Sequence, residues 1–188
     1  MKIRLAAYLQ SDSIVDGEGI RTVIWTQGCP HACLGCHNPE TWSFTDGELV
    51  DVSEVCEIID TLEGQDGITF SGGDPFTQPK ACAEIARYAR SKGLNIWSYT
   101  GFRWEELIEI SKRKPEVMEF LKELDVLVDG RFVLEQKSFS CIFRGSTNQK
   151  IIDVPKSLKK GKIVEIEKYI VKKDNTISNR TRQEGIFV

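Results

Sequence analysis

Short apolar runs alternate with longer amphipathic segments along most of this chain. Runs rich in β-branched and aromatic residues predict buried strands, because such side chains pack well on a pleated sheet. The strands expected from this pattern lie at residues 22–26, 67–70, 95–99, 125–128, 140–143 and 151–154. Most of these runs are separated by enough residues for a helix.

The separating segments carry apolar residues at helical spacing on one face. One starts at Val52, where residues 51–54 resemble a capping box. The segment 79–93 opens with proline and closes with glycine, as helices commonly do. A further helix from Trp104 is expected to break near Pro115 and then continue.

This alternation predicts an α/β fold, with crossover helices joining parallel strands. We expect an open, partial (β/α) barrel of about six mainly parallel strands, because six strands are too few for a closed eight-stranded barrel. The main domain is expected to span residues 1–158. Residues 159–188 are expected to form a basic C-terminal extension, with a small hairpin over 162–188 because 164–171 alternate like a strand.

The composition is that of an ordinary globular protein, with 28% charged and 40% hydrophobic residues among 188. No apolar run approaches the length of a membrane span, and residues 1–8 lack the apolar region of a signal peptide. Six cysteines without an export signal predict a reducing, cytoplasmic location, where thiolates are free to bind metal. No membrane association is expected.

The net charge of −3 hides an asymmetry. Residues 156–188 carry nine basic and four acidic side chains, whereas residues 1–155 carry sixteen and twenty-four. Acids are interspersed in the basic tail and aromatic residues are few, so nucleic-acid binding is not expected. The tail is interpreted as a solvated appendage or as a docking element for a protein partner.

Three cysteines within eight residues are the strongest chemical signal in the chain. Cys29, Cys33 and Cys36 have the spacing C-x3-C-x2-C and follow the strand at 22–26. Three thiolates on one loop can hold three corners of a cubic iron–sulfur cluster, which leaves the fourth iron open. An open iron serves a cluster that binds and reduces a substrate rather than one that only transfers electrons.

Other uses of these cysteines remain open at this point. A structural zinc site would need His31 or His37 as its fourth ligand, because the chain has no second cysteine pair. We expect both histidines to be neighbours of the site or to face solvent. Redox-active thiols are a further alternative. A disulfide framework fits less well, because Cys56, Cys82 and Cys141 are scattered and are expected to be core cysteines.

Two further motifs also follow predicted strands, where α/β folds commonly place their sites. Gly72 and Gly73 allow a close approach of the backbone to a ligand, and Asp74 could accept hydrogen bonds from an ammonium group. Asp129 and Arg131 flank a glycine after a later strand, and Arg131 could pair with a carboxylate. The alternative for each motif is an ordinary turn.

Together these motifs resemble the radical S-adenosylmethionine superfamily. More narrowly, they resemble the activating proteins of anaerobic (class III) ribonucleoside-triphosphate reductase. The matching stretches cover roughly residues 1–158 with gaps, and comprise residues 12–21, 28–31, 36–42, 71–76, 128–132, 143–149 and 151–154. The resemblance departs from the superfamily at Gly35, where an aromatic residue is common, so that adenine stacking must come from elsewhere.

The resemblance implies a [4Fe–4S] cluster and S-adenosylmethionine as cofactors. Cys29, Cys33 and Cys36 would hold the cluster, and the amino and carboxylate groups of S-adenosylmethionine would bind the fourth iron. The other implied contacts are Gly72, Gly73 and Asp74 to the amino end, the backbone of Gly35, Cys36 and His37 to the adenosyl part, and Asp129 and Arg131 as weaker matches.

The resemblance also implies the reaction and the partners. One electron from the cluster would cleave S-adenosylmethionine to methionine and a 5′-deoxyadenosyl radical, which would take a hydrogen atom from a backbone glycine of the reductase. A low-potential donor such as flavodoxin would supply the electron, and the basic tail would suit an acidic donor or dock the reductase. The alternatives are a short radical enzyme acting on a small molecule, similar to the deazaguanine synthases, and a non-catalytic iron–sulfur or zinc binding module.

Overall fold

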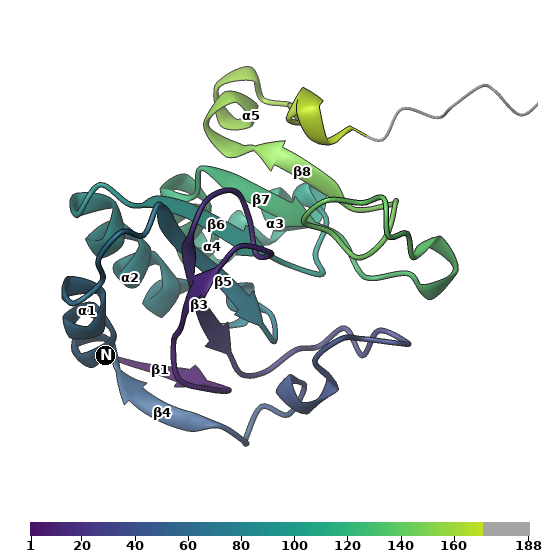
Figure 1. The fold of residues 1–188 in the computed structure, drawn as a ribbon. Helices are drawn as coiled ribbons and strands as arrows, with labels where there is room; N and C mark the ends of the chain where they lie inside the picture. Colours follow the sequence, from purple (N-terminus) through teal and green to yellow (C-terminus); the bar gives the residue numbers. More distant parts are fainter. Residues whose placement is uncertain (171–188) are drawn as a thin grey trace, which may run out of the picture.

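Eight strands form one mixed sheet in the computed structural model, which describes residues 1–170 (Figure 1). The strands are β1 (Lys2–Leu5), β2 (Gln10–Ser13), β3 (Arg21–Thr26), β4 (Glu48–Asp51), β5 (Gly67–Gly72), β6 (Asn95–Tyr99), β7 (Val126–Asp129) and β8 (Lys150–Asp153). Their order is β4-β1-β3-β5-β6-β7-β8, with β2 also paired to β3. The central strands β3, β5, β6 and β7 are parallel, and the flanking strands are antiparallel.

The α/β class with a parallel central sheet is confirmed, but the expected count of six strands is wrong. Strands β1, β2 and β4 were not predicted because each has only four residues and includes charged or polar side chains. The strand expected at 140–143 is also wrong. These residues lie in turns of the loop between β7 and β8, where Ile142 is 59% exposed rather than packed in a sheet.

Helices α1 to α4 lie where the apolar stripes predicted them, whereas α5 was not predicted. They are α1 (Val52–Asp60), α2 (Pro79–Ser91), α3 (Trp104–Ser111), α4 (Pro115–Glu123) and α5 (Val154–Lys160), with 3-10 turns at Pro39–Thr41, Pro75–Thr77, Leu134–Gln136 and Glu167–Tyr169. Asp51 is the N-cap of α1, but its side chain makes no capping hydrogen bond, so the expected capping box does not form. Asp51 is also the last residue of β4 and pairs with Lys2 of β1 instead.

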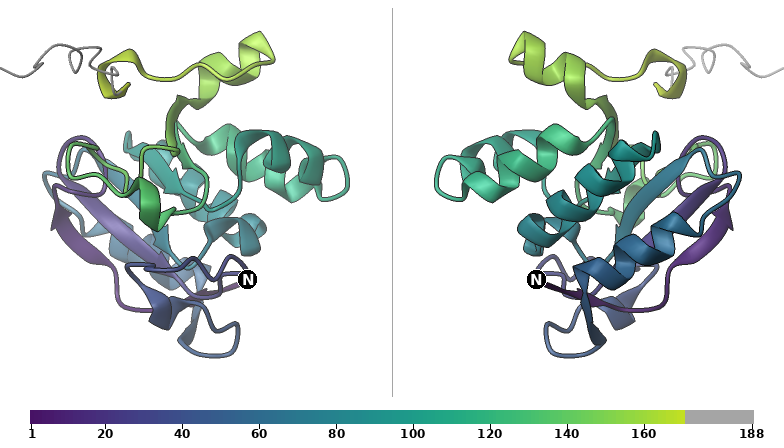
Figure 2. Two further views of the ribbon diagram at one scale, coloured as in Figure 1. Left: turned by 90° about the vertical axis from the view of Figure 1, so that its right-hand side faces the viewer. Right: turned by 90° about the vertical axis from the view of Figure 1, so that its left-hand side faces the viewer.

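The core is divided between the two faces of the sheet. Helices α1 to α4 gather on one face, as Figure 2 shows, and pack there against apolar strand residues such as Ile96. Side chains alternate along a strand, so the neighbouring Trp97 points to the opposite face and joins a smaller cluster with Val128 and Ile151. Phe120 of α4 is fully buried and meets the ring of Phe70 edge-on, which anchors the helical layer.

The segment after α5 returns to the sheet. Glu165 forms an isolated antiparallel bridge with Ile152 of β8, and the turn Glu167–Tyr169 follows. The strand expected at 164–171 is therefore wrong for the described residues up to 170. The rest of the expected hairpin over 162–188 lies outside the described residues, and the boundary at residue 158 stays a prediction. Within residues 1–170 no helix is both long enough and apolar enough to cross a membrane.

Candidate active site

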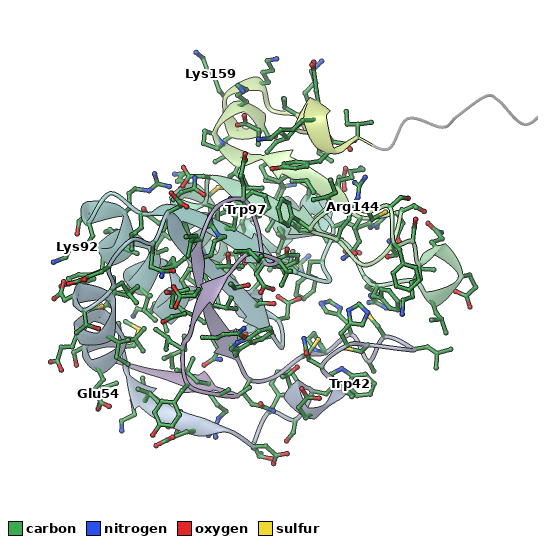
Figure 3. The ribbon with its side chains drawn as sticks, viewed as in Figure 1. Trp42, Glu54, Lys92, Trp97, Arg144 and Lys159 are labelled. Carbon is green, nitrogen blue, oxygen red and sulfur yellow. The ribbon has the colours of Figure 1, made fainter. Side chains whose placement is uncertain are left out.

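The carboxyl ends of the parallel strands meet at one edge of the sheet, and a cavity of about 960 Å³ lies there. Its wall includes Cys29, Cys33, Cys36, Gly72, Gly73 and Gly101. Loops after β3, β5, β6 and β7 therefore bring the predicted cysteines and glycines to one space, as the strand pattern led us to expect. In Figure 3, Trp42 and Arg144 mark opposite sides of this edge of the sheet.

The three cysteines lie on a tight loop, here called the cluster loop (residues 28–38). All three are half-buried free thiols. The amide of Cys36 donates to the carbonyl of Cys33 at 3.1 Å, which closes a turn through Gly35. Gly35 has a φ of +75°, and a β-carbon there would lie 3.1 Å from Leu134 Cδ1. A side chain at position 35 is thus disfavoured by both backbone conformation and space.

The environment of the cysteines controls their charge. Burial raises the pKa of Cys29 to about 11, and a backbone hydrogen bond from His31 opposes this effect only in part. Burial likewise raises the pKa of Cys33, against a backbone hydrogen bond from Phe132. Both thiols are therefore protonated near neutral pH, so that iron must displace protons to bind them.

The donor set fits an iron–sulfur cluster. Thiolates are the usual ligands of such clusters, and each cysteine binds a separate iron. The amide of Asn38 donates to Cys36 Sγ at 3.4 Å, a type of contact that tunes cluster potentials. Within residues 1–170, no three side chains of His, Cys, Asp or Glu are grouped closely enough to hold a single metal ion.

Gly72 and Gly73 pack the end of β5 directly against the cluster loop. A β-carbon on Gly72 would lie 2.6 Å from the carbonyl oxygen of Thr26, and one on Gly73 would lie 2.5 Å from that of Gly28. The amide of Gly73 donates to Thr26 at 2.7 Å. Both positions therefore require glycine because two backbones approach closely, and the same absence of side chains leaves their backbone exposed to the cavity.

Asp74 does not line the cavity. Its side chain is fully buried and accepts hydrogen bonds from within the protein. His31 Nε2 lies 2.6 Å from Oδ2, Thr100 Oγ1 donates at 2.9 Å and the amide of Gly101 donates at 3.0 Å. The amide of Phe76 donates to Oδ1 at 3.0 Å. The Gly-Gly-Asp motif therefore lies beside the cysteines as predicted. The carboxylate of Asp74, however, is directed toward the cluster loop and is not part of the cavity wall.

Asp129 and Arg131 also lie outside the wall of this cavity, although Gly130 between them is part of it. Asp129 is buried and accepts hydrogen bonds from the amides of Trp104 at 2.8 Å and Lys150 at 3.2 Å. Burial raises the pKa of Asp129. Arg131 is exposed at a separate, smaller pocket with Asn148. Both side chains therefore stabilise or border the loops around the site.

Trp42 and Arg144, which were not predicted as site residues, both line the cavity. Trp42 Nε1 and Arg144 Nε are buried and find no hydrogen-bond acceptor among the described residues. A buried donor without a partner is costly unless a ligand accepts from it. Both nitrogens are enclosed by protein atoms, so it is other atoms of these two residues that line the cavity. Their only signal in the sequence was their place in the stretches 36–42 and 143–149.

The loop after β2 and the loop before β8 complete the wall. Asp16 lies in the first loop and accepts a hydrogen bond from Ser13 at 2.5 Å. Cys141 lies in the second loop and is half-buried, so the expectation that it is a core cysteine is wrong. Cys82 is fully buried as expected, and Cys56 packs partly buried against the core. The error at Cys141 follows from the incorrect strand at 140–143.

Comparison with known proteins agrees with this site. Residues 15–152 match a family described as a 4Fe-4S single cluster domain. The chain is 36% identical over 154 residues to the anaerobic ribonucleoside-triphosphate reductase-activating protein of Haemophilus influenzae. The matched region covers 76% of this chain and 94% of that protein. The protein of the same name from Escherichia coli is 36% identical over 145 residues, covering 72% and 90%. That of Enterobacteria phage T4 is 33% identical over 144 residues, covering 73% and 86%.

The fold and the cysteine-lined cavity thus define a [4Fe–4S] protein of the single-cluster class. Within this class, the chain belongs to the family of anaerobic ribonucleoside-triphosphate reductase-activating proteins. The predicted family, its cluster and its class as an activating enzyme are therefore confirmed. The interpretations as a small-molecule enzyme or as a non-catalytic module receive no support.

Proposed function

We propose that this chain is a radical S-adenosylmethionine activase that generates a glycyl radical on anaerobic ribonucleoside-triphosphate reductase. The observation that carries the proposal is one cavity that brings together three cysteine thiols and the exposed backbone of a Gly-Gly turn. The relatives named as activators of this reductase support the choice of substrate. The cluster supplies the single electron that cleaves S-adenosylmethionine when it is bound.

The roles proposed for the residues follow from their places in the wall. Cys29, Cys33 and Cys36 hold the cluster. The backbone of Gly72 and Gly73 faces the amino end of S-adenosylmethionine, and the backbone of residues 35–37 faces its adenosyl part. Other atoms of Trp42 and Arg144 line the same space and border this ligand. Asp129 and Arg131 contribute by shaping the loops next to Gly130.

Phe132 is the proposed source of adenine stacking. Gly35 leaves no side chain at the position where an aromatic residue is common, and a β-carbon there would lie 3.4 Å from Phe132 Cε1. Phe132 lines the cavity, and its ring centre lies 5.1 Å from that of His37. The aromatic surface comes from the loop after β7 and occupies the space beside Gly35. A flat apolar face at this place suits an adenine ring.

A protein substrate is favoured by the rim of the cavity. Ile14 and Val15 are each 70% exposed, and Ile142 is 59% exposed, although all three border the cavity. S-adenosylmethionine is charged and polar, so it does not account for apolar side chains at the mouth. An apolar surface around a site commonly marks contact with another protein. We assign this rim to the reductase segment that carries the glycine.

The remaining parts of the proposal rest on the sequence. A low-potential donor such as flavodoxin delivers the electron, and the protein works in the cytoplasm without binding membrane or nucleic acid. The sheet forms an open, partial (β/α) barrel around the cavity. Residues 1–158 make up the catalytic domain, and the basic extension from residue 159 is an auxiliary element.

The test is an anaerobic assay of S-adenosylmethionine cleavage. The protein is reconstituted with iron and sulfide, reduced with dithionite and supplied with S-adenosylmethionine, with and without the reductase. The proposal predicts 5′-deoxyadenosine from the wild-type protein and none from Cys33→Ala. A protein with a full cluster that gives no product even with the reductase present would contradict the proposal.

A further inference from the structure

The buried carboxylate of Asp74 joins three loops of the site. His31 comes from the cluster loop, Thr100 and Gly101 follow β6, and Phe76 follows Asp74 itself. All of them hydrogen-bond to this one group, at 2.6 to 3.1 Å. Asp74 is thus the point at which the ends of β5 and β6 are tied to the loop that carries the cysteines.

The hydrogen-bonding capacity of this carboxylate is already used. Oδ1 accepts from the amide of Phe76, Oδ2 accepts from the amide of Gly101 and contacts His31, and the single hydroxyl proton of Thr100 lies within reach of both oxygens. A carboxylate offers about four acceptor positions, so none remains for an ammonium group. To contact a ligand in the cavity, Asp74 would have to leave several buried donors without a partner, which is unfavourable.

His31 is held equally firmly. Its side chain is 3% exposed, and the edge of its ring meets Phe102 with the ring centres 4.5 Å apart. Gly101 packs so closely on the imidazole that any β-carbon there would collide with it. His31 lies two residues after Cys29 and two before Cys33. Fixing this ring therefore fixes the segment between two of the proposed cluster ligands.

We infer that Asp74 is a positioning residue that holds the cluster loop in its cluster-binding conformation through His31, and that it does not bind the ammonium group of S-adenosylmethionine. This inference rests on the proposed function for the identity of the cluster and of the ligand. The hydrogen bond between Asp74 and His31 fixes the position of the cluster loop. Within the motif of residues 72–74, only Gly72 and Gly73 then contact S-adenosylmethionine.

The test combines Asp74→Asn and His31→Phe in a double-mutant cycle. His31→Phe keeps a ring but removes the donor, and His31→Gln restores an N–H group at a similar reach. The first readout uses the metal-free protein, in which the alkylation rates of Cys29, Cys33 and Cys36 are measured by mass spectrometry. The second is the iron retained per chain after reconstitution, and the third is the affinity of the loaded protein for S-adenosylmethionine.

We expect Asp74→Asn and His31→Phe each to raise the alkylation rates about fivefold or more and to lower iron retention, and the double variant to add little to either. His31→Gln should recover most of both properties. The S-adenosylmethionine affinity of the loaded fraction should change less than about twofold. A merely structural role would not produce this coupling and rescue at unchanged ligand affinity. Asp125→Asn is the control, because Asp125 accepts from the Ile96 amide at the opposite end of the sheet.

The inference is overturned if Asp74→Asn leaves alkylation and iron unchanged but weakens S-adenosylmethionine binding about tenfold or more. Additive effects in the double variant would equally contradict action through His31. If Asp74→Asn does not fold, His31→Phe and His31→Gln decide the question, since neither alters the carboxylate. If the wild-type protein binds no S-adenosylmethionine, the proposed function fails, while the alkylation rates still test the positioning of the loop.

Discussion

At the scale of single residues, the site depends on three thiols and on positions where no side chain fits. The thiols are not activated as nucleophiles, because burial raises the pKa of Cys29 and of Cys33. Their function comes from the loop that directs all three to one cavity. The glycines beside them allow two backbone segments to pack without intervening side chains.

Replacing any one cluster cysteine is expected to abolish stable cluster binding, because the remaining two thiolates leave a second iron without a protein ligand. Cys141→Ser should keep its iron, even though Cys141 lines the same cavity, because the fourth iron must stay open for the ligand. Iron and sulfide analysis after anaerobic reconstitution measures both. Loss of iron in Cys141→Ser would identify a fourth ligand and contradict the open site.

Gly73→Ala is expected to disrupt the cluster loop. Its β-carbon would collide with the backbone of Gly28, and overpacking of this kind costs about 1–3 kcal/mol. The matched control is Gly64→Ala. Its β-carbon would contact no atom, so that only the positive φ lowers the stability, by about 1–2 kcal/mol. Thermal unfolding compares their stabilities, and iron retention should fall only in Gly73→Ala. Equal iron retention in both variants would show that the close approach is not needed for the cluster.

At the scale of elements, the loop after β2 is tied to the C-terminal segment of the described chain. Lys168 Nζ lies 2.6 and 2.7 Å from the two carboxylate oxygens of Glu18, and Tyr169 donates to Glu18 at 3.0 Å. Tyr169 also packs edge-on against Trp97 and Phe143, and its carbonyl accepts from Arg144. The turn Glu167–Tyr169 thus braces two walls of the cavity from outside.

This brace is expected to weaken in acid. Hydrogen bonds from Lys168 and then Tyr169 hold the pKa of Glu18 below its ordinary value of 4.5. A carboxylate with a lowered pKa in the folded state stabilises the protein above the unfolded pKa, and this contribution is lost as the pH falls through the folded pKa. Glu18→Gln should therefore lower the melting temperature slightly at pH 7, and this difference should shrink as the pH falls below 4.5. A difference that does not change over this pH range would contradict this account.

The elements also show what the sequence could predict. Strands β3, β5, β6 and β7 are largely buried and were located from their runs of β-branched and aromatic residues, which are typical of buried parallel strands. The short antiparallel strands β1, β2 and β4 gave no such signal, although β8 was predicted from its apolar residues. The direction of the Asp74 carboxylate could not be predicted either, since it depends on donors from His31 and from residues after β6, which are distant in the chain.

At the scale of the whole molecule, the cavity opens through an apolar rim formed by separate loops. Ile14 and Val15 belong to the loop after β2, and Ile142 belongs to the loop before β8, which also carries the exposed Phe139. Phe139 is 98% exposed. These loops come from distant parts of the chain and meet only because the parallel strands end at one edge. The fold therefore creates the rim together with the site.

Phe139→Ser is expected to impair activation of the reductase while sparing cleavage of S-adenosylmethionine alone. Phe139 does not line the cavity but is exposed on the same loop as Cys141 and Ile142, so its loss removes apolar area from that loop and leaves the cavity wall unchanged. Tyr8→Ser is the control, because Tyr8 is 85% exposed and lies at a different pocket. The reductase concentration needed for half-maximal radical formation should rise in Phe139→Ser only. An equal rise in both variants would remove the rim from the interface.

The most direct test of the central claim is electron paramagnetic resonance on the reductase itself. The reconstituted protein, S-adenosylmethionine and a reductant are incubated anaerobically with anaerobic ribonucleoside-triphosphate reductase, and the sample is scanned for a glycyl radical. If this chain activates the reductase, a stable radical doublet should appear on the reductase, accompanied by 5′-deoxyadenosine and absent with Cys33→Ala. Abundant 5′-deoxyadenosine with no radical on the reductase would show that the substrate has been assigned incorrectly.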